Sequence, residues 1–176
     1  MRTFQQFVSL CEGGLARQLS NAKDKDTGHI SADRGSDEGE NRKKRKGLEK
    51  DLKKKGIGYK KTTGKYKYDD GSDASEVSYS TTKPEGMSKR KFGKTMRKLG
   101  RKHDQESVIT KKPGKKATLH YTDKSGKKSE GLGKEKAGKH PDGYGETGEK
   151  RQRGSKLKDK KKDRSMHYAW RHSSNF

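Results

Sequence analysis

Four polar side chains in the middle of the chain have the residue types that a nucleophilic active site would need. Ser107 and His120 could act as nucleophile and general base, with Glu76 orienting the imidazole and Gln105 close by. The sequence supplies no nucleophile elbow, no oxyanion-binding loop and no pair of carboxylates at a useful spacing. Polar side chains on the solvated face of a small sheet explain the same residues. We therefore predict no catalytic residues and a protein that is not an enzyme.

The sequence also offers no pattern for a metal or a cofactor. Its single cysteine, Cys11, excludes an internal disulfide framework and a cysteine zinc cluster. The six histidines lack paired ligand spacing, and His167 and His172 fit a partly ordered aromatic tail better than a metal site. The glycines from 131 to 148 do not lead into Gly-Lys-Ser/Thr, so they form no phosphate loop. We predict neither metal nor cofactor.

Composition limits how much of the chain can fold around an apolar core. Leu, Ile, Val and Phe supply only 19 of 176 residues, while 47 Lys and Arg face 24 Asp and Glu for a formal charge of +23. Chains of this kind usually bury too little apolar surface to offset the entropy of ordering. The composition argues against a compact enzyme fold over the full length and favours a small core within a solvated chain. No apolar run is long enough to span a membrane.

The excess positive charge lies after residue 41, where it suggests a nucleic-acid surface. Lysines alternate with Tyr59, Tyr66 and Tyr68, and basic residues coat a predicted helix further on. Lysines give salt-sensitive phosphate contacts, and exposed tyrosines can stack on bases, so we predict binding to DNA without sequence preference. Alternatively, the tyrosines belong to the core. The predicted nucleic-acid contacts are Lys60, Lys61, Lys65, Lys67, Lys89, Arg90, Lys94, Arg97, Lys98 and Arg101.

The first twelve residues differ from everything that follows. Phe4, Phe7 and Val8 recur at helical spacing after Thr3, which can cap a helix, and Gly13-Gly14 then breaks the pattern. Twelve residues are too few for a stable isolated helix in water. We expect this segment to need a partner groove or an assembly.

The opening Met-Arg-Thr-Phe-Gln-Gln-Phe-Val resembles the capsid-targeting peptide of internal head proteins of T-even-type tailed phages. The resemblance implies delivery into the prohead scaffold and removal of the peptide by a prohead protease that cuts after Leu-x-Glu. The targeting residues would be Thr3, Phe4, Phe7 and Val8. The cleavage site would be Leu10, Glu12 and Gly13. The alternative is a short helix that packs on the core and stays attached.

Residues 13–41 and 124–165 are poor in large apolar side chains. Gly, Ser, Asn and Asp dominate most of the first range, which predicts a flexible linker. Gly, Lys and Glu dominate the second, which predicts a disordered basic tail. The aromatic segment 166–176 could anchor that tail on the core or on a partner.

Residues 42–123 predict a small α+β domain with an antiparallel sheet, in the order α-β-β-α-β-β. Leu48 and Leu52 indicate a first helix that ends at Gly56. Ser88 caps a second helix that ends at Gly100. The strands are expected over residues 57–68, 76–82, 107–110 and 117–122.

The same region resembles a small uncharacterised domain family of bacteria and phages, a domain of unknown function. The matching segments are Gly58-Tyr59, Gly64-x-Tyr66, Glu76-Val77-Ser78-Tyr79 and Gln105-Glu106-Ser107-Val108. The resemblance implies a fold and no activity.

Together these features predict a non-enzymatic, basic phage protein that is packaged in the virion head with the genome and binds nucleic acid electrostatically. Its partners would be double-stranded DNA, the prohead scaffold and the prohead protease, with no membrane contact. The alternative is a small protein of the host cytoplasm that binds a host protein through residues 42–123.

Overall fold

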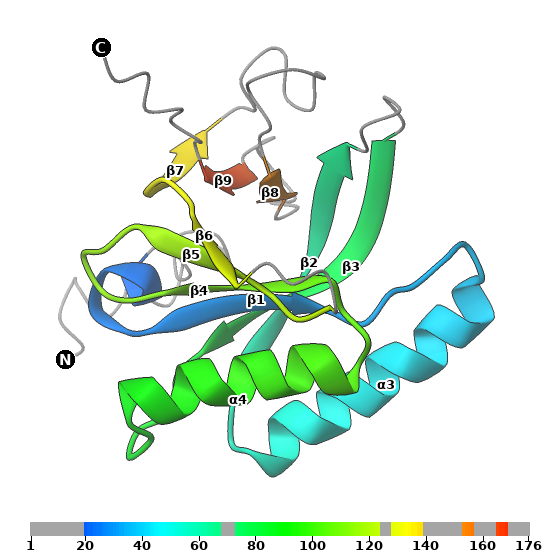
Figure 1. Cartoon of the computed structure of the whole chain (residues 1–176), viewed down its shortest axis with the longest axis horizontal. Helices are drawn as coiled ribbons and strands as arrows, with labels where there is room; N and C mark the ends of the chain where they lie inside the picture. Colours follow the sequence, from blue (N-terminus) through cyan, green and yellow to red (C-terminus); the bar gives the residue numbers. More distant parts are fainter. Residues whose placement is uncertain (1–19, 68–72, 124–127, 139–152, 157–164, 169–176) are drawn as a thin grey trace, which may run out of the picture.

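The computed structural model describes residues 20–67, 73–123, 128–138, 153–156 and 165–168 (Figure 1). They form an α+β fold in which every paired strand runs antiparallel to its neighbour. The main elements are β1 (Thr27–Ser31), α3 (Glu38–Lys54), β2 (Gly58–Lys67), β3 (Asp73–Thr82), α4 (Lys89–Lys102), β4 (Ser107–Lys111) and β5 (Ala117–Tyr121). The short strands β6 (Ser129–Gly131), β7 (Glu135–Gly138), β8 (Arg153–Lys156) and β9 (Ser165–Tyr168) follow. The predicted class and the order α-β-β-α-β-β from α3 to β5 are confirmed.

The strands form one sheet in the order β6-β5-β4-β1-β3-β2-β8-β9-β7, with β1 between β3 and β4. The outermost strands β6 and β7 are joined by residues 132–134 alone. Consecutive Cα atoms are about 3.8 Å apart, so the facing ends of β6 and β7 lie within about 15 Å of each other. The sheet must therefore curl. In Figure 1, β7, β8 and β9 stand on the side of β1 and β4 that faces away from α3 and α4.

Both long helices begin at side-chain caps. The carboxylate of Asp37 accepts a hydrogen bond from the N–H of Glu40, and the hydroxyl of Ser88 accepts one from the N–H of Lys91. Each bond satisfies one of the N–H groups that the first turn of a helix leaves without a partner. The helices then cover one face of the sheet (Figure 1).

The apolar core lies between the two helices and that face of the sheet. Along β1 and β3 every second residue points into it, as the period of a strand requires. The rings of Tyr79 on β3 and Tyr59 also meet in a T-shaped contact, with the ring centres 5.5 Å apart. Tyr59 is thus partly core. The buried cluster contains Ile30, Ala32, Leu48, Leu52, Ile57, Tyr79, Phe92, Met96, Leu99 and Val108.

The other face of the central strands is polar and also buried. His29 lies opposite Ser80, and Ser31 lies opposite Ser78, so these four side chains share the face that points away from the helices. All four are buried. Burial lowers the pKa of His29 to about 4, which leaves its imidazole neutral at pH 7. Around His29, β1 and β3 therefore line the inner face of the curled sheet with neutral polar groups, whereas β4 and β5 add Lys111 and Leu119 to the same face.

Several predicted boundaries are wrong. The range 13–41 contains the central strand β1 and the first turn of α3, whose cap Asp37 lies within the predicted linker. Gly100 does not end α4, which runs to Lys102. The range 124–165 contains β6, β7, β8 and the first residue of β9, which pair with neighbouring strands through their backbones. The predicted targeting peptide 1–12 lies outside the described residues, as does Trp170.

The two glycines of α4 provide a matched test of the core. A Cβ at Gly100 would lie 2.7 Å from Cγ1 of Val108 and 2.9 Å from Cγ2 of Thr122, whereas at Gly93 the nearest atom is 3.6 Å away. Gly100→Ala should lower the free energy of unfolding by about 1–3 kcal/mol through overpacking. Gly93→Ala should raise it by about 0.5–1 kcal/mol because alanine favours the helix. Urea unfolding of both variants measures these changes, and equal effects would contradict this packing of α4.

Candidate functional site

The candidate site lies where β3 extends past the end of β1. The last pair between these strands is Ser31 with Ser78, although β3 continues to Asp73. The Oδ2 atom of Asp33 accepts a hydrogen bond from the backbone N–H of Val77 at 2.8 Å. The hydroxyl of Ser31 donates to the carbonyl of Val77 at 2.9 Å. Two side chains thus take the place of the missing strand and hold the β3 backbone next to Glu76.

Glu76 has an unusual environment for a carboxyl group. Its side chain is half-buried on the polar face of β3, and the hydroxyl of Ser78 lies 3.5 Å from its Oε1 atom. Burial raises the pKa of Glu76 to about 7, and the nearby carboxylates of Asp33 and Glu106 add to this rise. Hydrogen bonds from the hydroxyls of Ser31 and Ser78 oppose it. No ion pair reaches Glu76 from the part of the chain that the structure describes.

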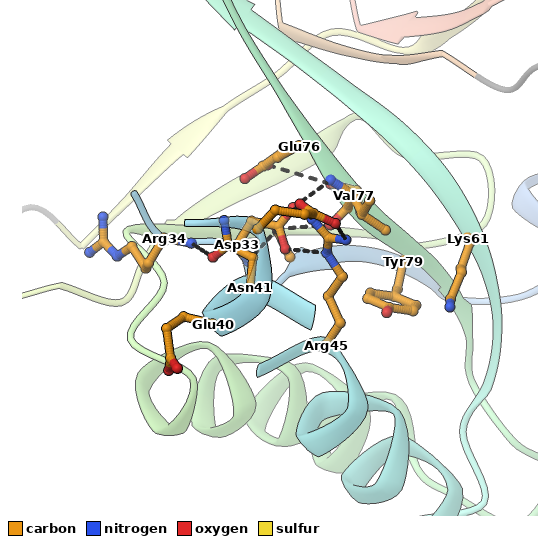
Figure 2. A network of polar contacts seen from close by, with 12 residues as sticks. Asp33, Arg34, Glu40, Asn41, Arg45, Lys61, Glu76, Val77 and Tyr79 are labelled. Atoms are coloured by element: carbon orange, nitrogen blue, oxygen red, sulfur yellow. Dashed lines mark hydrogen bonds and ion pairs between the residues drawn. The ribbon is translucent and has the colours of Figure 1, made fainter. Parts of the chain in front are cut away.

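Asp33 is paired by Arg45 from α3 (Figure 2). The Nε and Nη2 atoms of Arg45 donate to the two carboxylate oxygens of Asp33 at 2.6 and 2.9 Å. The same guanidinium binds both oxygens of Glu38 at 2.7 and 2.8 Å. These two carboxylates, that of Asp33 most strongly, raise the pKa of Arg45. Asp33 and Arg45 are largely buried, with side-chain exposures of 9% and 15%, so their charges are compensated within the protein.

The loop after β1 is held by Arg34. Its Nη1 atom lies 2.7 Å from Oε1 of Glu106, and its Nε atom donates to the carbonyl of Asp104 at 2.6 Å. The backbone N–H of Arg34 donates to Oδ1 of Asn41 on α3 at 2.7 Å. These contacts tie β1, α3 and the start of β4 together around the site. Figure 2 shows Asp33 from the loop after β1, Asn41 and Arg45 from α3, and Glu76 from β3 converging.

The predicted constellation of Glu76, Gln105, Ser107 and His120 is only partly brought together. The side-chain amide of Gln105 lies 3.4 Å from the carbonyl of Asp33, close to the candidate site. Ser107 faces Tyr121 across the strand pair, while His120 faces Val108 on the opposite side of the sheet. His120 instead contacts Oγ1 of Thr110 at 2.8 Å. A Ser107–His120 pair is therefore excluded by the register of β4 and β5.

The predicted nucleic-acid residues lie on two separate elements. Lys60 and Lys61 belong to β2, where Lys61 forms an ion pair with Glu49 at 2.8 Å. Lys65 and Lys67 also lie on β2, but their side chains are outside the described residues. Arg97 on α4 is half-buried. The exposed residues of α4 among those predicted are Lys89, Arg90, Lys94, Lys98 and Arg101.

Asp33 and Arg45 were missed by sequence reasoning. Asp33 lies in the range that predicted a linker, and Arg45 is part of the basic run 42–46. Neither residue stands out by type. The two side chains meet only because the chain bends between β1 and α3, and the sequence does not reveal that bend. The one available signal was the acidic cap Asp37 ahead of the Leu48 and Leu52 stripe.

A model of the S-adenosylmethionine lyase family matches residues 28–166. This span covers β1 to β9 almost completely and is well over half of the chain. The chain belongs to the S-adenosylmethionine lyase family. The lyase family match includes all of the residues that surround Glu76. No curated protein and no solved structure gives a significant match.

Membership of the lyase family corrects several predictions. The chain belongs neither to the phage internal head proteins nor to a domain family of unknown function. The prediction of a non-enzymatic, packaged DNA-binding protein is wrong for the same reason, because the lyase family is a family of enzymes. The resemblance to a capsid-targeting peptide rested on twelve residues, all of which precede the matched span. Cleavage at Leu10, Glu12 and Gly13 and the predicted location stay predictions.

In the part of the chain that the structure describes, no group of three or more His, Cys, Asp or Glu side chains could hold a metal ion. No helix of that part is long and apolar enough to cross a membrane. Glu76 is thus the described group whose environment most clearly suits chemistry at neutral pH.

The burial of Glu76 predicts a pH-dependent cost in stability. Its pKa of about 7 in the folded chain exceeds the ordinary 4.5, so folding favours the protonated form between these values. The stability of the wild type should therefore fall, relative to Glu76→Gln, as the pH rises from about 4.5 to about 7. A relative loss of about 2–3 kcal/mol is expected. Urea unfolding at pH 4.5 and 8 measures it, with exposed Glu85→Gln as the control. Parallel pH curves for wild type and Glu76→Gln would contradict the burial.

Proposed function

We propose that this protein is a lyase that cleaves a carbon–sulfur bond of S-adenosylmethionine, with the ionised carboxylate of Glu76 facing the cationic substrate. The family match supports the substrate and the class of reaction. The observation that carries the assignment of the site is the half-buried Glu76 carboxyl, which has a pKa of about 7. Such a group is close to half ionised at neutral pH and needs little free energy to lose its proton.

The chemistry of a sulfonium explains why one anionic group is sufficient. A lyase breaks the carbon–sulfur bond without adding water, and the electron pair of that bond stays on sulfur as a neutral thioether. As that bond breaks, the same carbon forms a bond to an oxygen of the substrate's own carboxylate, which gives an internal ester, or the adjacent carbon loses a proton to a base, which gives an alkene. In both cases the positive charge on sulfur disappears. An ionised Glu76 holds the cation in place, and in the second case it also accepts the proton.

The charges of the described residues favour Glu76 for this task. The chain carries +23 overall and repels a cation at long range. Asp33 is compensated by Arg45, and Glu106 by Arg34. Glu76 has hydroxyl groups as neighbours and keeps an uncompensated charge once it ionises. Two opposite charges at 4 Å attract by about 4 kcal/mol at an effective dielectric constant of 20, which is enough to orient the substrate.

The full-length protein should convert S-adenosylmethionine to a thioether without a methyl acceptor or added cofactor. Glu76→Gln removes the charge and keeps the shape, so we expect kcat/KM to fall by at least about 100-fold, or about 3 kcal/mol of transition-state stabilisation. Liquid chromatography with mass spectrometry of the products measures this and identifies the carbon fragment. Exposed Glu85→Gln is the matched control and should retain wild-type activity. Substrate that stays intact with the folded wild type would refute the proposal, as would full activity of Glu76→Gln.

The pH dependence should report the ionisation of Glu76. Since the carboxylate form is required, kcat/KM should rise with pH and level off above a midpoint near 7. A bound cation favours the ionised form, so the midpoint in kcat should be lower than that in kcat/KM. Initial rates from pH 5 to 9 measure both curves. A flat kcat/KM profile through pH 7 would show that another group carries the reaction.

A further inference from the structure

We propose that Asp33 and Arg45 are positioning residues for Glu76, because the Asp33 carboxylate, held by the Arg45 guanidinium, fixes the backbone of β3 at Val77. This inference rests on the proposed function in assigning the reaction to Glu76. Neither residue needs to touch the substrate. They act on Glu76 in two ways: through the backbone N–H of Val77, which Asp33 binds, and through the negative charge of Asp33.

The geometry supports a positioning role in three connected steps. Arg45 binds both oxygens of Asp33, which removes the freedom of that carboxylate to rotate. Oδ2 of Asp33 also accepts the N–H of Val77, so the β3 backbone is anchored one residue from Glu76. The hydroxyl of Ser31 holds the carbonyl of Val77 and accepts the N–H of Asp33 at 3.1 Å. The Glu76 side chain therefore projects from the residue next to Val77, whose backbone N–H and C=O are both held.

Asp33 also acts on Glu76 through its charge. Among the side chains that the structure describes, the groups that face Glu76 are Ser31 and Asp33 at the end of β1, Ser78 on β3 and Glu106 before β4. Arg45 lies behind Asp33, and Arg34 lies behind Glu106. Asp33 raises the proton affinity of Glu76, while Arg45 limits that rise by compensating Asp33. Removal of the Asp33 charge should thus lower the pKa of Glu76, whereas removal of the Arg45 charge should raise it.

The two substitutions to compare are Asp33→Asn and Arg45→Met. Both should lower kcat by at least about 10-fold and change KM by less than about 3-fold, because the substrate-facing groups remain while Glu76 is misdirected. The acidic limb of the kcat/KM profile should move to lower pH in Asp33→Asn, which removes a negative charge. It should move to higher pH in Arg45→Met, which leaves that charge uncompensated.

Two readouts do not depend on activity. Carbon NMR of the glutamate carboxyls should show the titration midpoint of Glu76 moving in the same two directions. Amide hydrogen exchange should become at least about 10-fold faster at Val77 in both variants. Arg45→Lys keeps the charge and should restore most of the titration midpoint, which also covers the case in which Arg45→Met fails to fold. Glu40→Gln is the control, since it removes a carboxylate from the same end of α3 that pairs only with Lys43 among the described residues.

The outcomes separate this inference from the proposed function. Unchanged kcat, unchanged Val77 exchange and equal pH limbs in folded variants would overturn the positioning role. If the acidic limbs of the two variants' kcat/KM profiles move in the same direction, the electrostatic effect of Asp33 and Arg45 on Glu76 is overturned. If the wild type does not cleave S-adenosylmethionine but the Glu76 midpoint and Val77 exchange change as expected, the proposed function fails and the positioning of Glu76 stands.

Discussion

The backbone N–H of Val77 binds a carboxylate where a strand neighbour is missing, and the site is built around this contact. β3 extends beyond the end of β1, so, among the described residues, the edge of β3 that β1 would pair has no strand neighbour between Asp73 and Val77. A backbone N–H that leaves water must find another acceptor. Asp33 supplies it, and the negative charge that it brings into a largely buried place then requires Arg45. The direction of the chain after β1 and the placement of the first turns of α3 follow from these requirements.

The balance of charge explains why one carboxyl differs from the others. In a chain of net charge +23, the acidic side chains that pack between elements find cations easily. Glu49 pairs with Lys61, Asp51 with Lys102, and Glu106 with Arg34. Glu76 lies on the polar face of β3 among hydroxyl groups and close to two other carboxylates. A half-buried carboxyl without a paired cation lowers the stability of the fold, so stability alone does not explain it. A site that binds a cationic substrate does explain it.

The elements that the sequence predicts well are those specified by local spacing. The stripe of Leu48 and Leu52 and the cap at Ser88 each lie within one helix, so propensity and periodicity were enough to identify α3 and α4. β1 escaped because a five-residue strand of mixed polarity has no distinctive period. The site escaped because Asp33, Arg45 and Glu76 come from three elements, and only the register of β1 on β3 unites them. Among the polar residues that were interpreted as a solvated sheet face, Gln105 is buried, and the others are half-buried: Glu76, Ser107 and His120.

The low apolar content, which argued against an enzyme, is a consequence of how the sheet is used. A threshold on composition assumes that a buried surface is an apolar surface. Here the helices cover one face of the sheet, where the strand period places the apolar residues. On β1 and β3 the other face is buried with serine, threonine and histidine side chains, and hydrogen bonds of the hydroxyl groups replace apolar contacts there. On β5 the same face carries the buried apolar side chains of Ala117 and Leu119. A small apolar core is thus sufficient because β1 and β3 bury polar side chains on the face away from the helices. This polar part of the sheet is where the fold holds the Glu76 carboxyl, whose pKa is about 7.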